Sequence, residues 1–114
     1  MSFSQTEKVL IEAVVEAFIA RRRPAAHIRE KLDHSYRLKG QSVELFEIRP
    51  KFNDHSVKLN IDYAKATYVK TRKIWKVYWK RGNGQWWPYI PHKVKKIEDF
   101  IRLVEKDKDH CFFG

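Results

Sequence analysis

The residues with the clearest chemistry are lysines, arginines and aromatic residues gathered in one segment, 63–97. This segment holds ten Lys and Arg residues and no Asp or Glu. It also contains all four tryptophans of the chain and four of its five tyrosines. Lysine and arginine bind phosphates by displacing condensed counterions, and unpaired bases stack on flat aromatic rings. Such a segment is typical of a surface that binds single-stranded nucleic acid or RNA.

The candidate nucleic-acid-binding residues are the basic and aromatic residues that this segment can place on a sheet surface. They are Lys65, Arg72, Lys73, Lys76, Tyr78, Lys80, Arg81, Trp87 and Tyr89. A purely structural explanation competes, because strand tryptophans are often core residues and strand lysines prevent sheets from pairing at their edges. A third interpretation is that the same face is buried in a homodimer or against another protein.

Carboxylates, histidines and the cysteine form no recognisable catalytic or metal-binding pattern. Glu44 and Glu47 are three residues apart in a predicted strand and should therefore point to opposite faces. A phosphodiesterase or nuclease using these acids with Lys65 is the least favoured alternative. His110 and Cys111 are adjacent, but the other histidines lack the spacing of metal ligands. We expect no catalytic residue, no metal and no cofactor.

The net charge is segregated along the chain. The formal charge of the 114 residues is +10, and 14 of the 24 basic residues lie outside the basic segment, against 14 acidic residues there. The whole excess of positive charge therefore belongs to residues 63–97, which favours an anionic partner. One cysteine excludes an intrachain disulfide, and no signal peptide or long apolar run is present. We expect a single domain, 1–114, in the cytoplasm and not in a membrane.

Two helices are predicted at the two ends of the chain. Ser4 and Glu7 have the spacing of a capping box, and apolar residues then recur at helical intervals until the arginines before Pro24. Residues 24–32 favour a short helix or turn. Apolar residues in 97–104 predict a second helix, with acids in its first turn. The aromatic residues near the C-terminus should fold back onto the body.

Strand patterns fill the chain between these helices. The predicted strands are 35–39, 43–49, 64–70, 74–81 and 85–90. Pro50 is expected to end the second strand, 51–62 to form a loop, and Pro91 to close the sheet. The fold class is therefore α+β: a single antiparallel sheet of about five strands, a hairpin plus a three-stranded meander, with the N-terminal and C-terminal helices packed on one face.

Alternation in strand 74–81 predicts which side chains lie on which face. Trp75, Val77 and Trp79 should face the core. Lys76, Tyr78 and Lys80 should then face outward. Only this second set bears on function.

Several blocks of sequence, in order, resemble one family. They are HIREKLD, GQSVELFEIRP, AKATYVKTRKIWKVYWKR, a W..Y pair and CFFG. The blocks are similar to the bacterial domain-of-unknown-function family 3024, small proteins of proteobacteria that sometimes occur in mobile gene cassettes. The resemblance covers about residues 20–114 and implies a small cytosolic single-domain protein with no assigned activity.

The resemblance also marks motif positions without giving them a role. They are Glu47, Arg49, Lys65, Lys70, Trp75, Tyr78, Trp79, Arg81, Trp86 and Tyr89. Two positions depart from the family pattern: Phe52 replaces a usual Trp, and Trp87 replaces a frequent His. The second departure argues against a histidine-dependent active site.

Overall fold

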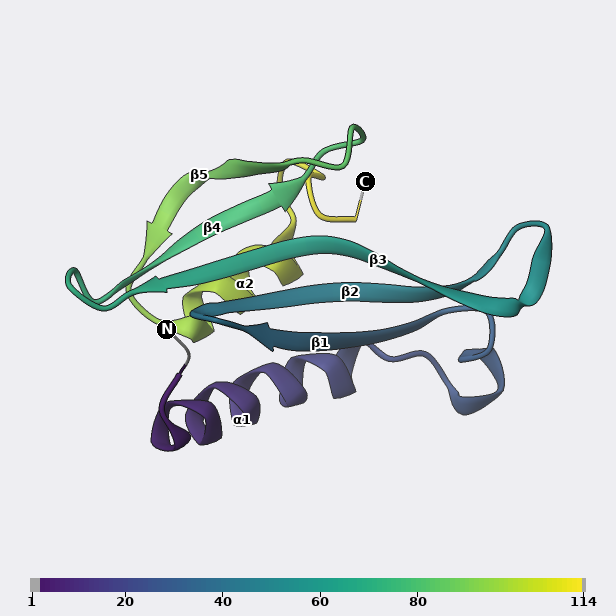
Figure 1. Cartoon of the computed structure of the whole chain (residues 1–114), viewed down its shortest axis with the longest axis horizontal. Coiled ribbons are helices and arrows are strands. Elements are labelled where there is room, and N and C mark those ends of the chain that lie inside the picture. The colour runs from purple at the N-terminus through teal and green to yellow at the C-terminus, as the bar shows by residue number, and fades with distance from the viewer. Residues whose placement is uncertain (1–2, 114) are drawn as a thin grey trace.

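A computed structural model describes residues 3–113 and shows one five-stranded antiparallel sheet with both helices on one face (Figure 1). The strands follow one another in the order β1-β2-β3-β4-β5, so each pairs with its neighbour in sequence. The elements are α1 (Gln5–Arg22), a 3₁₀ turn η1 (Ala26–Ile28), β1 (Asp33–Lys39), β2 (Ser42–Lys51), β3 (Asp54–Val69), β4 (Ile74–Lys80), β5 (Trp86–Val94) and α2 (Ile97–Lys106). The predicted α+β class and the placement of the helices are confirmed.

Helix α1 begins at the predicted capping box. The Ser4 hydroxyl accepts a hydrogen bond from the Glu7 amide at 3.2 Å, and the Glu7 carboxylate accepts one from the Ser4 amide at 2.8 Å. Two of the unpaired amides at the helix start are thereby satisfied. The helix ends just before Pro24, as expected from the restriction that proline places on the residue before it.

The core lies between the sheet and the two helices. Val15 and Phe18 of α1 and Phe100 and Val104 of α2 are fully buried in it. From the middle of the sheet, Val77 is fully buried, Trp75 is almost so, and Trp79 packs against the cluster. The predicted core face of β4 is therefore confirmed, and the opposite face of the sheet is left open to solvent.

The predicted loop at 51–62 is wrong, because these residues continue the sheet as a hairpin arm. β2 runs through Pro50 to Lys51, a two-residue turn follows, and β3 begins at Asp54. The arm extends beyond the other strands at one end of the molecule (Figure 1). The last residue of β2 paired with β1 is Ile48, so β2 is already an edge strand at Pro50. A proline is tolerated there because its missing N–H removes no bond to a neighbour.

Pro91 does not close the sheet either. β5 continues through it to Val94, and Lys93 pairs with Lys76 of β4. β5 is the outermost strand, so it also accommodates proline. The other predicted strand ends agree with the structure to within two residues.

The C-terminal tail folds back onto the sheet, as predicted. The Asp107 carboxylate accepts hydrogen bonds from the Phe112 amide at 3.0 Å and the Phe113 amide at 3.1 Å. Phe112 is buried against Tyr89, with ring centroids 4.8 Å apart. Gly114 of the CFFG block lies outside the described residues. Within residues 3–113, no helix is long and apolar enough to cross a bilayer.

Candidate nucleic-acid interface

The open face of the sheet, opposite α1 and α2, carries a row of lysines near the β1–β2 and β3–β4 turns. Strand register places five side chains side by side across all five strands: Lys39, Ser42, Thr67, Lys76 and Lys93. We call these five residues the lysine row. It contains no acid, and the Ser42 and Thr67 hydroxyls at its centre lie 2.7 Å apart.

Lys76 and Lys93 are directly opposed in the lysine row. Like charges at opposed positions of an antiparallel pair destabilise the sheet. Neither lysine is within ion-pair distance of an acid in residues 3–113. Arg72 and Lys73 lie exposed in the adjoining β3–β4 turn. This end of the open face is therefore an uncompensated cationic surface.

Lys65 occupies the middle of the open face, between Glu44 on β2 and Tyr78 on β4. Its Nζ lies 4.9 Å from the centroid of the Tyr78 ring and 5.0 Å from that of Trp86. Burial lowers the pKa of Lys65, the Lys80 charge adds to this, and Glu44 opposes it. The two rings are partly exposed, so the centre of the face combines a cation with aromatic surface.

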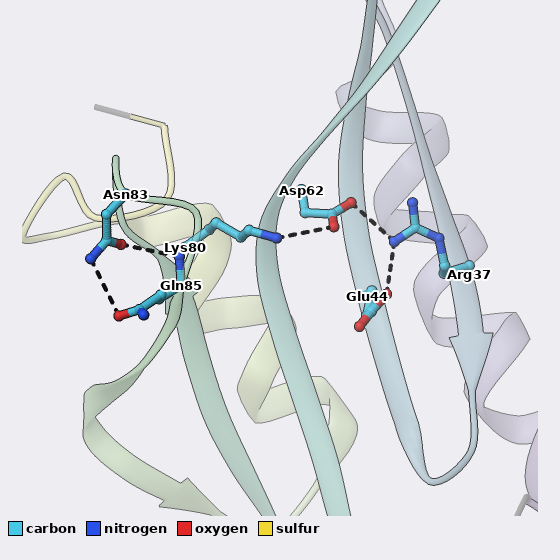
Figure 2. A network of polar contacts seen from close by, with 6 residues as sticks. All are labelled: Arg37, Glu44, Asp62, Lys80, Asn83 and Gln85. Carbon is cyan, nitrogen blue, oxygen red and sulfur yellow. Dashed lines mark hydrogen bonds and ion pairs between the residues drawn. The ribbon is translucent and has the colours of Figure 1, made fainter.

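The acidic side chains on the open face come from residues that precede the acid-free segment 63–97. Arg37 Nη1 donates to Glu44 at 2.7 Å and to Asp62 at 3.0 Å, and Lys80 Nζ lies 3.5 Å from Asp62 (Figure 2). Lys80 Nζ also lies 4.8 Å from the Trp86 ring centroid. The half of the face near the arm is thus a neutralised ion-pair network, in contrast to the lysine row.

The structure brings some of the predicted binding residues together and separates others. Lys65, Lys76, Tyr78 and Lys80 share the open face. Arg72 and Lys73 extend its cationic end at the turn. Three others do not join this face: Arg81 stacks on Trp87 at 4.3 Å on the opposite side of the β5 edge, and Tyr89 is buried in the core. Tyr89 is thus unavailable for base stacking because its ring is covered by Phe112.

Sequence reasoning missed several members of the open face. Lys39 and Lys93 are not among the candidates, because the sequence pattern places Lys93 beyond the expected end of the sheet and Lys39 in the separate predicted hairpin. Trp86 pairs with Lys80. Because adjacent strand residues point to opposite faces, alternation could have shown that Trp86 lies on the open face when Trp87 does not. Asp62 is missed because the sequence pattern predicts a loop at 51–62. The alternation Val57, Leu59, Ile61 could have revealed that its segment is a strand.

The catalytic alternatives gain no geometric support in the described part of the chain. Glu44 and Glu47 do lie on opposite faces, as predicted, since Glu44 bonds to Arg37 while Glu47 is opposite buried His34. Glu47 instead accepts from Arg49 Nε at 3.0 Å. Over residues 3–113, no three His, Cys, Asp or Glu side chains gather as metal ligands would.

Comparisons with known proteins give the family and nothing more specific. No curated protein matches the chain, and no solved structure does. A family described as Domain of unknown function (DUF3024) matches residues 3–114, essentially the whole length. By this match, the chain belongs to the DUF3024 family.

Proposed function

We propose that this protein binds single-stranded nucleic acid on the open face of its sheet, without catalysis. The observation that carries the proposal is the lysine row, above all the opposed pair Lys76 and Lys93. A phosphate lying between two opposed lysines would turn an unfavourable contact into a favourable one.

The composition of the lysine row supports phosphate as the bound group. Three lysines and two hydroxyls share the row, and side chains of both kinds donate hydrogen bonds to phosphate oxygens. Because Ser42 and Thr67 are bonded to each other, one hydroxyl hydrogen of the pair is available to a phosphate. Arg72 and Lys73 would lengthen the cationic track past the edge of the row. A backbone with repeated negative charges fits such a track better than a single anion does.

The rings next to the row support an unpaired strand over a duplex. Tyr78 follows Lys76 on the same face of β4, and Trp86 on β5 lies opposite Lys80, the next residue of β4 on that face. Unpaired bases stack on such rings with little sequence preference, whereas bases within a duplex are already stacked. Lys65, which lies beside Trp86 and in no ion pair among the described residues, would meet a phosphate between stacked bases.

The test is a titration of a fluorescein-labelled oligothymidylate over a salt series. We expect binding at low salt, with the logarithm of affinity falling by about 0.7 per phosphate contact for each unit of log salt. Replacing Lys76→Gln with Lys93→Gln should weaken binding and reduce the slope by about 1.4 if two contacts are lost. Lys8→Gln with Lys106→Gln removes the same charge from α1, where Lys8 is half-buried, and from α2, where Lys106 is exposed, and serves as the matched control.

Equal losses in the two double variants would contradict the proposal, because they would indicate attraction to net charge alone. Absence of binding at low salt would do so as well. The rival interpretation, a homodimer or protein-binding module using the same face, predicts another outcome: a dimeric mass by light scattering that Tyr78→Ala converts to a monomer.

A further inference from the structure

A cleft opens where β3 and β4 part. Their last register pair is Ala64 with Trp79, and beyond it β3 continues into the arm while β4 turns towards β5. The bulged residue Tyr63 lies at this point, between Ala64 and Asp62. The cleft has a volume of about 530 Å³, within the roughly 300–1,000 Å³ of small-molecule sites.

The floor of the cleft is aromatic. Tyr63, Phe112 and Phe113 line it, and the Tyr63 and Phe113 ring centroids are 4.7 Å apart. Tyr63 is only 5% exposed, and its hydroxyl has no hydrogen-bond partner in residues 3–113. Buried hydroxyls are nearly always bonded, so the unpartnered hydroxyl of this lining residue leaves a polar group beside the cleft to be satisfied.

One cation of the cleft is uncommitted. Arg49 is paired with Glu47 and Lys80 with Asp62, at 3.0 and 3.5 Å. Arg81 has no carboxylate partner in the described residues, and Trp87 holds its guanidinium in place at 4.3 Å. A guanidinium fixed by stacking retains its donors for a phosphate in the plane of the group. Beside it, Gly82 has no side chain and open space around its Cα.

We propose that this cleft binds one nucleotide, with its base against Phe113, the half-buried ring of the floor, and its phosphate on Arg81. The exposed Asn60 amide, on the wall formed by β3, can both donate to and accept from a base edge. Lys80 and Asp62 belong to the open face and to the cleft wall alike. The cleft would thus receive an unstacked or terminal nucleotide of a bound strand, a role that rests on the proposed function.

Adenosine 5′-monophosphate, titrated by calorimetry and by NMR shifts, tests the cleft without the open face. We expect it to bind about tenfold more tightly than adenosine, the ratio typical of one charge-assisted contact. Arg81→Gln should remove this difference, and Asn60→Ala should weaken both ligands. Both altered side chains are exposed, so the variants should fold. Lys8→Gln with Lys106→Gln, which lie on the two helices and outside the cleft lining, is the control and should leave both affinities unchanged.

Two results separate this inference from the proposed function. If the oligonucleotide binds, the monophosphate does not, and Arg81→Gln leaves the oligonucleotide affinity unchanged, the cleft inference is overturned and the proposed function stands. If the monophosphate binds with the expected dependence and no oligonucleotide binds, the cleft is supported as a site for a free mononucleotide, and the function proposed for the open face is overturned.

Discussion

At the scale of single residues, Arg37 joins three strands of the open face. It bonds to Glu44 on β2 and Asp62 on β3 while its guanidinium lies 4.4 Å from the Phe46 ring centroid. Phe46 is buried although it lies on the solvent side of the sheet, because Arg37 covers it. Here one side chain provides two ion pairs and the packing over an aromatic ring.

Removing this side chain should destabilise the protein substantially. Arg37→Met leaves buried Glu44 without its bonded cation, and we expect the free energy of unfolding to fall by about 1–3 kcal/mol. Arg49→Met breaks the more exposed pair with Glu47 and should cost less than about 1 kcal/mol. Urea denaturation followed by tryptophan fluorescence measures both. Equal costs would show that Arg37 contributes no more than a surface ion pair.

His34 makes stability depend on pH. It is buried between Tyr63 and Phe113, and burial lowers its pKa below the ordinary 6.5. The charged groups that act on it are Glu47, Arg22, Asp33 and Arg49. As pH falls through 6.5, the unfolded chain takes up a proton at this histidine and the folded chain does not, so stability present above pH 6.5 is lost below it.

Unfolding by urea at a series of pH values checks this sign. We expect a loss between pH 7 and 5 with a slope of at most about 1.4 kcal/mol per pH unit from this group. His34→Gln should remove that part of the slope, whereas His55→Gln, on the exposed arm, should retain it. A slope unchanged in both variants would assign the effect to other groups.

At the scale of elements, the sequence predicts helices better than strand ends. The α1 start follows from side-chain bonds within one turn, so a local pattern is sufficient. Whether a strand continues through Pro50 or Pro91 depends on whether a neighbouring strand still pairs with it on both sides at that residue. The sequence around the proline does not contain that information. The same limit applies to the open face: alternation predicts that Lys76, Tyr78 and Lys80 share a face, but only register brings in Glu44 and Asp62.

The C-terminal tail depends on a single side chain of the segment after α2. Asp107 caps the helix at a φ of 41° and holds two tail amides. Asp107→Ala should lower the free energy of unfolding by about 2–3 kcal/mol and speed hydrogen exchange at Phe112 and Phe113, because these amides lose their acceptors. Asp107→Asn retains an acceptor oxygen and tolerates the left-handed backbone, so it should restore part of the loss. If alanine and asparagine are equally destabilising, the backbone bonds do not hold the tail.

At the scale of the whole molecule, the positive charge is concentrated although ion pairs are present elsewhere. Pairs tie α1 to α2 through Arg21 and Glu105 and the chain after α1 to β1 through Arg23 and Asp33. The lysine row and the neighbouring Arg72 and Lys73 have no such partners among the described residues. Repulsion within the folded state is therefore concentrated at one end of the sheet, where the proposed ligand would relieve it.

Salt should stabilise the free protein by screening this repulsion. Raising sodium chloride from low to physiological concentration shortens the screening length to about 8 Å, and we expect the urea midpoint to rise. Lys76→Gln with Lys93→Gln should reduce the salt-dependent gain in the free energy of unfolding by about 0.2–1 kcal/mol, the range of one cross-strand pair. The matched pair Lys8→Gln with Lys106→Gln should retain it. A gain of the same size in all three proteins would place the repulsion elsewhere.

The arm gives β3 two different halves. From Ala64 to Thr67 the strand is paired with both β2 and β4, but from Asp54 to Asp62 it is paired with β2 alone. Its apolar residues there, Val57, Leu59 and Ile61, remain partly exposed. With one neighbour and little burial, the outer half can unzip from its tip while the inner half stays intact. One continuous strand therefore passes from a part that opens only with the whole fold to a part that opens by itself.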